Sequence, residues 1–193
     1  MHYTLTDLVT DIAQNGAESG ANTLELHINE AYYSPDREEF CFKVKDNGKG
    51  MSDLELKYAG DPFVNDGIKH PHRKAGLGLP FLIQTAECSG GGWEMESGIA
   101  EGTTVRGRFD LCNVDTPPVG DLPGMFRTIL LFLGPDEVVI QRAVDGELIY
   151  QIKKNELIYS LGPLEDAESL ILLDTYLRSI EENLIKGEAK WPS

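Results

Sequence analysis

The chain has 193 residues, of which 41% are hydrophobic and 25% charged, a balance that excludes disordered, collagenous and low-complexity classes. Asp and Glu outnumber Lys and Arg by 32 to 17, so the net charge is −15. Because a field of that sign repels phosphates at long range, we expect no general binding to nucleic acid or to anionic membranes. Any bound phosphate must be held by a specific local site.

The cysteine pattern and the start of the chain bear on its compartment. Cys41, Cys88 and Cys112 are spaced for neither a zinc site nor a disulfide framework, which favours free thiols in a reducing cytoplasm. The first residues lack a basic start followed by an apolar run, and no stretch approaches the roughly 18 apolar residues of a membrane span. The sequence therefore predicts a cytoplasmic protein without a signal peptide or membrane span.

The first part of the chain predicts helices interspersed with hairpin-connected strands. Apolar residues recur with a helical period over 4–19, and a second helix is expected over 79–88. Strands are expected where apolar and polar residues alternate, at 23–28, 40–44, 93–96 and 103–109. This pattern predicts an α+β fold, a two-layer α/β sandwich with helices on one face of a mainly antiparallel sheet.

A segment rich in proline and glycine, residues 113–124, divides the sequence. It cannot sustain a helix or a central strand, so we expect a domain boundary there. The expected organisation is a domain over 1–112, a linker over 113–126 and a small C-terminal α/β appendage over 127–193.

The appendage is expected to contain three strands and a long final helix. The strands fall at 128–133, 138–142 and 148–152. The helix, over 166–186, has apolar residues at alternating steps of three and four, namely Leu170, Leu173, Leu177, Ile180 and Leu184. This seam fits either docking on the chain's own sheet, which we favour, or a homodimer formed through the final helix.

Three polar residues share a face of the first helix. Asp11, Asn15 and Glu18 are spaced i, i+4 and i+7, away from the apolar stripe. Their oxygen atoms could hold a hard cation such as magnesium together with phosphate oxygens. The alternative is an ordinary solvated polar face, which we favour when these residues are considered alone.

Two glycine-containing segments adjoin regular elements. Asp46–Gly50 directly follows a strand and is either a hairpin turn or a site where Asp46 accepts a hydrogen bond from a ligand amine. In the second case, Gly48 and Gly50 would let the ligand approach the backbone. Lys74–Leu79 precedes a helix, where glycines expose backbone donors to an anion.

A basic patch precedes the second glycine segment and consists of Lys69, His70, His72, Arg73 and Lys74. In so acidic a chain it fits either an anion site or a flexible loop that happens to be basic. The two histidines do not predict a metal site, because no further ligands cluster near them in the sequence.

In their order along the chain, these segments resemble the ATP-binding domain shared by histidine kinases, type II topoisomerases, the large heat-shock chaperones and MutL mismatch-repair proteins. This is the GHKL or Bergerat fold, and the histidine-kinase branch fits best. The resemblance rests on an N box, a first glycine box, a phenylalanine box, a second glycine box and a final Gly-Thr motif, at 11–21, 43–51, 61–63, 76–91 and 101–105.

The resemblance implies a magnesium-dependent ATP site. Asp46 would accept a hydrogen bond from the adenine amine, and Gly50 and Thr103 or Thr104 would assist through water. Asn15 would ligate Mg²⁺. Residues 60–75 would form a lid whose basic patch lies over the triphosphate. The full set of ATP-binding residues implied is Asn15, Asp46, Gly48, Gly50, Lys74, Gly76, Leu77, Gly78, Leu79, Thr103 and Thr104.

Three features depart from the family pattern. Asp11, the candidate catalytic residue, stands where hydrolysing branches have a glutamate that activates water, and it is one methylene shorter. Lys74 stands at a position of the second glycine box where the family commonly has a glycine. No phosphoacceptor domain precedes the N box, so we expect no complete sensor kinase. None of the four histidines lies in an acceptor-like sequence: His2, His27, His70 and His72.

Three functions therefore remain open. The first, which we favour, is a stand-alone Mg-ATP-binding protein that phosphorylates or regulates a protein partner, as the anti-sigma-factor kinases of this fold do. The second is an ATPase whose hydrolysis drives a conformational cycle. The third is a module that senses ATP or ADP without chemistry.

Overall fold

The computed structural model describes residues 4–59 and 78–188, and within them the chain forms six helices and six strands. In chain order the elements are α1 (Leu5–Glu18), β1 (Thr23–Ser34), β2 (Arg37–Asp46), α2 (Asp53–Tyr58), α3 (Gly78–Cys88), β3 (Gly92–Gly98), β4 (Gly102–Asp110), α4 (Leu122–Leu130), β5 (Glu137–Val144), β6 (Glu147–Lys153), α5 (Lys154–Leu161) and α6 (Ala167–Glu188).

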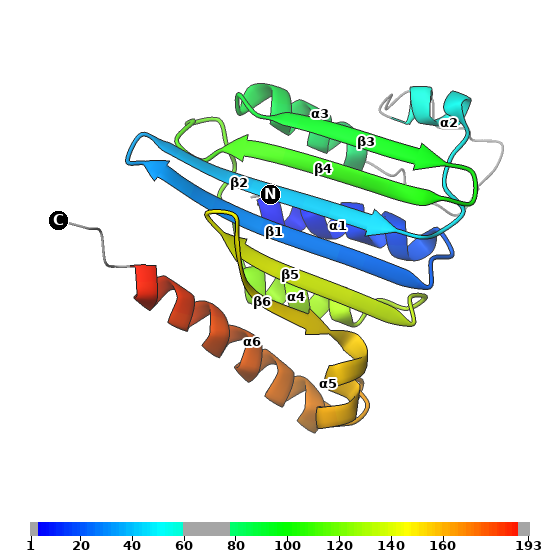
Figure 1. Ribbon diagram of the computed structural model, residues 1–193, viewed down its shortest axis with the longest axis vertical. Helices are drawn as coiled ribbons and strands as arrows, with labels where there is room; N and C mark the ends of the chain where they lie inside the picture. Colours follow the sequence, from blue (N-terminus) through cyan, green and yellow to red (C-terminus); the bar gives the residue numbers. More distant parts are fainter. Residues whose placement is uncertain (1–3, 60–77, 189–193) are drawn as a thin grey trace.

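The strands form one sheet in the order β3-β4-β2-β1-β5-β6, with helices α1, α3 and α4 on one face (Figure 1). Neighbouring strands are antiparallel except for β1 and β5, which are parallel. The face turned toward the viewer in Figure 1 carries none of these helices, and we call it the open face. The expected two-layer α/β sandwich with a mainly antiparallel sheet is confirmed.

Helix α1 begins and ends close to the expected residues because its ends are capped. The Thr4 side chain accepts a hydrogen bond from the Asp7 N–H, and the Asp7 carboxylate accepts one from the Thr4 N–H. The apolar stripe of α1 packs on β1 and β2, and Leu5, Leu8 and Val9 are fully buried. The polar residues on the other side of α1, Asp11, Asn15 and Glu18, are thereby left exposed.

The strand expected at 128–133 is wrong, because residues 122–130 form helix α4. Asp121 caps this helix by accepting a hydrogen bond from Gly124 N–H, and a proline occupies its first turn, where the missing N–H costs nothing. Leu122, Met125 and Ile129 recur with helical spacing and are buried. The helix also begins inside the range expected to be a linker, 113–126.

Residues beyond 127 extend the same sheet and share its core. β5 pairs in parallel with β1, from Thr23 opposite Glu137 to Glu30 opposite Val144. The two-residue turn between β5 and β6 places Asp145 and Gly146 at positive φ, as a tight hairpin requires. The strands expected at 138–142 and 148–152 are confirmed, although both are longer than expected.

Helix α6 packs on the rest of the chain through its predicted seam. Leu173 and Leu177 are fully buried in the common core, and Leu170, Ile180 and Leu184 are partly buried. This confirms the docking alternative, and the seam is not available for a coiled-coil dimer. Among the described helices, none is both long enough and apolar enough to cross a membrane.

A buried ionic cluster also joins α6 to the sheet. Arg142 on β5 is 2% exposed, donates to Glu30 on β1 and to the Ala143 carbonyl oxygen, and lies 3.4 Å through Nε from Glu181 Oε1 on α6. The Tyr150 hydroxyl on β6 also donates to Glu181. Burial raises the pKa of Glu30, and the Arg142 charge opposes this shift. We call the side chains of four residues the Arg142 cluster: Glu30, Arg142, Tyr150 and Glu181.

Candidate functional site

Asp46 is a buried carboxylate at the end of β2. It is 5% exposed and follows Phe42 and Val44 on the strand face that packs against the helices. Its Oδ1 accepts hydrogen bonds from Gly48 N at 2.8 Å and from Ser19 Oγ at 3.0 Å. Both donors provided by the described residues approach Oδ1. Oδ2 receives no hydrogen bond from a described residue, so it is the oxygen available to accept one from a ligand.

Glycines let the backbone close tightly around this carboxylate. A Cβ built on Gly48 would lie 1.8 Å from Ser19 Oγ, and one built on Gly102 would lie 2.0 Å from the Asp46 carbonyl oxygen. A Cβ on Gly16 of α1 would lie 3.3 Å from Asp46 Cβ. A side chain at position 48 would therefore displace Ser19, and one at position 102 would displace the Asp46 backbone.

The loop after Asp46 is tied to two neighbouring elements. The Asn47 side chain accepts hydrogen bonds from the backbone N–H groups of Asn22 and Thr23, each at 2.9 Å. The Lys49 N–H donates to the Ser19 carbonyl oxygen at 3.2 Å. The loop leads from β2 toward α2, so the hairpin-turn alternative for Asp46–Gly50 is wrong.

Gly50 and the β3–β4 turn form the next layer of the site. Gly50 has φ +61°, and a Cβ there would lie 1.8 Å from the Gly98 carbonyl oxygen. The Ser97 hydroxyl accepts a hydrogen bond from the Met51 N–H at 2.9 Å and donates to the Gly102 carbonyl oxygen at 3.0 Å. Because Gly50 has no side chain, its backbone can pack directly against the turn between β3 and β4.

The two threonines of the Gly-Thr motif lie on opposite faces of the sheet. Thr103 is paired with Asp46 across β4 and β2, and its hydroxyl lies 2.9 Å from that of Ser97. Thr104 is paired with Lys45, and strand alternation places it on the open face. The structure therefore brings Thr103, and not Thr104, to the side of Asp46.

The polar face of α1 meets the start of α3. A Cβ built on Gly78 would lie 3.1 Å from Asp11 Cβ and 3.7 Å from Asn15 Nδ2, so the N box and the second glycine box adjoin. Glu18 instead accepts a hydrogen bond from the Gln14 side chain at 2.9 Å. Within the described ranges, no three His, Cys, Asp or Glu side chains form a group that could hold a metal ion.

Some predicted site residues lie outside the described ones, namely Lys74, Gly76, Leu77, the phenylalanine box 61–63, the lid 60–75 and the basic patch. Leu79 is described, and its side chain packs in the core. The sequence interpretation missed three residues that shape the site, Ser19, Asn47 and Ser97. A serine directly before the glycine that ends a helix and an asparagine after a buried aspartate are the signals that could have pointed to the first two.

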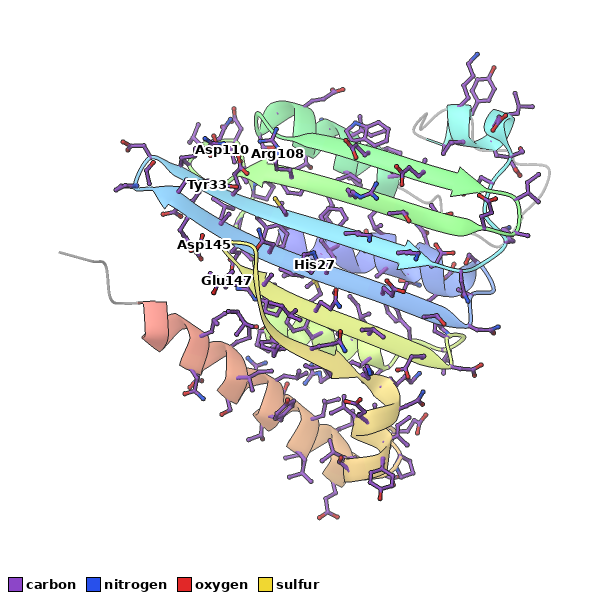
Figure 2. The ribbon with its side chains drawn as sticks, in the orientation of Figure 1. His27, Tyr33, Arg108, Asp110, Asp145 and Glu147 are labelled. Atoms are coloured by element: carbon purple, nitrogen blue, oxygen red, sulfur yellow. The ribbon has the colours of Figure 1, made fainter. Side chains whose placement is uncertain are left out.

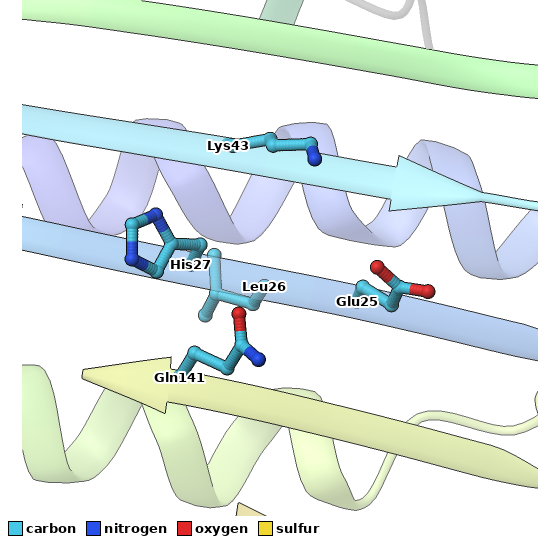
Figure 3. A pocket seen from close by; sticks show the side chains of 5 residues that line it. All are labelled: Glu25, Leu26, His27, Lys43 and Gln141. Carbon is cyan, nitrogen blue, oxygen red and sulfur yellow. The ribbon is translucent and has the colours of Figure 1, made fainter. Parts of the chain in front are cut away.

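The open face has a shallow pocket on the other side of the sheet from the Asp46 side chain. It has a volume of about 270 Å³ and is lined by Glu25, Leu26, His27, Lys43 and Gln141 (Figure 3). His27 lies over the strands on the side away from α1, α3 and α4 (Figure 2). Burial, and then the charge of Lys43 on the neighbouring strand, lower the pKa of His27 below its ordinary value of 6.5.

This shift predicts a loss of stability in mild acid. Below about pH 6.5 the unfolded chain takes up a proton that folded His27 resists, so the free energy of unfolding falls as the pH decreases. Urea unfolding at about pH 7.5 and about pH 5.5 should show a larger loss for the wild type than for His27→Gln, which cannot titrate. Equal losses in the two proteins would contradict the assigned shift.

Comparisons with known proteins give a match to a family profile and to a curated relative. The sequence profile of the family described as "Histidine kinase-, DNA gyrase B-, and HSP90-like ATPase" matches residues 2–113. The sensor histidine kinase SpaK of Bacillus subtilis is 31% identical over 114 residues. That match covers 58% of this chain and 23% of SpaK, so the chain corresponds to less than a quarter of that relative.

Two solved structures show a weaker likeness to this chain. The N-terminal domain of a DNA repair protein aligns with 77% of this chain and 52% of its own, with 13% identity and a TM-score of 0.43. The Aquifex aeolicus MutL ATPase domain complexed with ADP aligns with 80% of this chain and 65% of its own, with 15% identity and a TM-score of 0.36. The profile match spans more than half of the chain and includes α1, the Asp46 loop and β4, and on that basis the chain belongs to the histidine kinase-, DNA gyrase B- and HSP90-like ATPase family.

Proposed function

We propose that this protein binds Mg-ATP, with the adenine amine donating a hydrogen bond to Asp46 Oδ2. The observation that carries the proposal is the buried Asp46 carboxylate, whose two hydrogen bonds from described residues both reach Oδ1. Adenine presents an N–H₂ group at the position where guanine presents a carbonyl oxygen. A carboxylate oxygen accepts from the first and is repelled by the second.

Calorimetric titration of the protein with ATP and with GTP tests this proposal. We expect ATP to bind and GTP to bind at least about tenfold less tightly, because the mismatched pair leaves two buried acceptors facing each other. Equal affinity for the two nucleotides, or no binding of either, would overturn the assignment of Asp46.

Magnesium fits the same site through Asn15. This side chain is exposed on the polar face of α1, and its Nδ2 would lie 3.7 Å from a Cβ built on Gly78, so the start of α3 is beside it. An amide oxygen is a hard, neutral ligand suited to a cation that also holds phosphate oxygens and water. The bound cation would offset the negative charge of the triphosphate. Asn15 would hold the cation, and the N-terminus of α3 would help to orient the triphosphate.

Replacing Asn15 with Ala should reduce the magnesium dependence of ATP binding. Alanine is the best helix former, so α1 should remain intact. The matched control is Gln14→Ala, one residue earlier on the same exposed face, where Gln14 bonds Glu18. Titrations with and without magnesium should show a smaller magnesium effect for Asn15→Ala only. Full magnesium dependence in that variant would refute the role of Asn15.

We further propose that the protein is a regulatory kinase or signalling component that acts on a protein partner. In the described part of the chain the sole histidine is His27, which lies on the open face, opposite the side chain of Asp46. A phosphoryl group leaving ATP at this site would therefore need an acceptor other than His27. We propose that the acceptor lies on a protein partner.

The ATPase alternative depends on Asp11, whose Cβ would lie 3.1 Å from a Cβ at Gly78. Phosphate release should be measured with ATP and magnesium for the wild type and for Asp11→Asn. Steady release that the variant abolishes would favour hydrolysis over transfer to a partner. Without release, incubation with cell extract in ATP and in ADP, followed by mass spectrometry of captured proteins for phosphorylated sites, tests the kinase proposal.

A further inference from the structure

Ser19 connects the end of α1 to the Asp46 carboxylate. It is the residue that follows α1, and its hydroxyl lies 2.7 Å from the Gly16 carbonyl oxygen and 3.0 Å from Asp46 Oδ1. A hydroxyl carries one proton and can give a full hydrogen bond to one of these acceptors at a time. The acceptor that receives this proton determines whether the Ser19 hydroxyl stabilises the end of α1 or the Asp46 carboxylate.

The helix end does not depend on the hydroxyl. The Gly16 carbonyl oxygen already accepts the backbone N–H of Ser19 at 3.2 Å, so α1 keeps this closing bond without the side chain. Asp46 Oδ1, in contrast, has one other donor among the described residues, the Gly48 N–H. A carboxylate is also a stronger acceptor than a carbonyl group, so the hydroxyl proton is better used by Asp46.

The surroundings hold Ser19 in this position. Its carbonyl oxygen accepts a hydrogen bond from the Lys49 N–H at 3.2 Å, which ties its backbone to the loop after Asp46. A Cβ on Gly48 would lie 1.8 Å from Ser19 Oγ and 2.7 Å from Ser19 Cβ, so the loop backbone packs directly on the serine. The Ser19 backbone therefore cannot move away from Asp46 without moving the loop.

We propose that Ser19 is a positioning residue that orients Asp46 for the adenine amine. With two donors on Oδ1, from Ser19 and Gly48, the carboxylate is held so that Oδ2 is the oxygen left for the ligand. With one donor, the carboxylate can rotate about its Cβ–Cγ bond and present either oxygen. This inference rests on the proposed function, because it concerns the same carboxylate and the same ligand amine.

The test compares ATP with the triphosphate of the 6-unsubstituted purine nucleoside, which lacks the amine. Dissociation constants for both nucleotides should be measured by calorimetry for the wild type, Ser19→Ala, Asp46→Asn and Thr10→Ala. Thr10 is the matched control, since its hydroxyl also donates to a carbonyl oxygen on α1, that of Thr6, at 2.7 Å and without touching Asp46. Thermal denaturation checks that each variant is folded.

For Ser19→Ala we expect ATP affinity to fall about fivefold to tenfold, which lies within the range for losing one ordinary hydrogen bond. Affinity for the analogue should change less than about twofold, because the analogue has no amine to donate a hydrogen bond to Asp46. Thr10→Ala should leave both affinities unchanged. A structural role alone would lower both affinities in Ser19→Ala by the same factor, and that result would overturn the inference.

The same experiment separates this inference from the proposed function. If the wild type binds both nucleotides equally, Asp46 does not read the amine, and the proposed function fails. If the wild type prefers ATP, Asp46→Asn loses the preference and Ser19→Ala keeps it in full, the proposed function stands and the role of Ser19 is refuted.

Discussion

Replacing Asp46 with Asn is expected to weaken ATP binding tenfold or more, about 1.4 kcal/mol per decade. The substitution keeps the shape of the side chain and exchanges one acceptor oxygen for an N–H₂ donor. Gly48 N–H and the Ser19 hydroxyl both approach Oδ1, so they favour the amide oxygen at that position and place the new N–H₂ group at Oδ2. Two donors, the amide and the adenine amine, would then face each other in a buried site.

The matched control for this prediction is Asp110→Asn. Asp110 ends the neighbouring strand β4, and its carboxylate accepts from the Cys112 N–H at 2.9 Å, away from Asp46. Calorimetry should give unchanged ATP affinity for Asp110→Asn and weakened affinity for Asp46→Asn. Unchanged affinity in both variants, with both folded by circular dichroism, would remove Asp46 from the site.

A second large effect is expected from the Arg142 cluster. Replacing Arg142 with Met would leave the largely buried carboxylate of Glu30 and the buried carboxylate of Glu181 without their guanidinium partner. Breaking a buried ion pair from one side costs about 3–5 kcal/mol of folding stability. Urea unfolding should therefore show a clearly lower midpoint for Arg142→Met than for the wild type.

Arg106→Met is the control, since Arg106 pairs with Glu94 and Glu96 on the open face at 3.7 and 3.0 Å, where both glutamates are well exposed. Exposed pairs of this kind contribute about 0–1 kcal/mol. If Arg106→Met destabilised the protein as much as Arg142→Met, burial could not be the reason for the difference. Replacing Arg142, Glu30 and Glu181 together by apolar residues should recover much of the loss, because no unpaired charge remains.

Local patterns in the sequence predicted the elements that build the Asp46 site. The helical period over residues 4–19 and the alternation in β2 and β4 depend on neighbouring residues alone, and the structure confirms those elements. Asp46 and Thr103 belong to motifs that lie far apart in the sequence. They lie side by side in the structure because β2 and β4 are paired in this register.

Features that depend on distant segments could not be predicted in this way. The run at 128–133 is rich in residues that favour strands, but residues 128–130 belong to helix α4, whose Met125 and Ile129 are buried on one side. The hydrogen bond from Ser19 to Asp46 joins residues that the sequence places far apart, and no local period reports it. The face on which Thr104 lies follows from the pairing register, which a sequence pattern alone does not determine.

The parallel pairing of β1 with β5 has a consequence for how the protein is made. During synthesis from the N-terminus, β1 and β2 are complete long before residues 137–144 leave the ribosome. Until then, the edge of β1 that pairs with β5 has no partner strand. An unpaired strand edge flanked by apolar side chains such as Leu24, Leu26 and Ile28 is a template for association with other chains. A chain cut after the family-matched segment, near residue 113, would keep Asp46 and its donors but would carry this edge permanently, so its solubility would depend on finding a substitute strand.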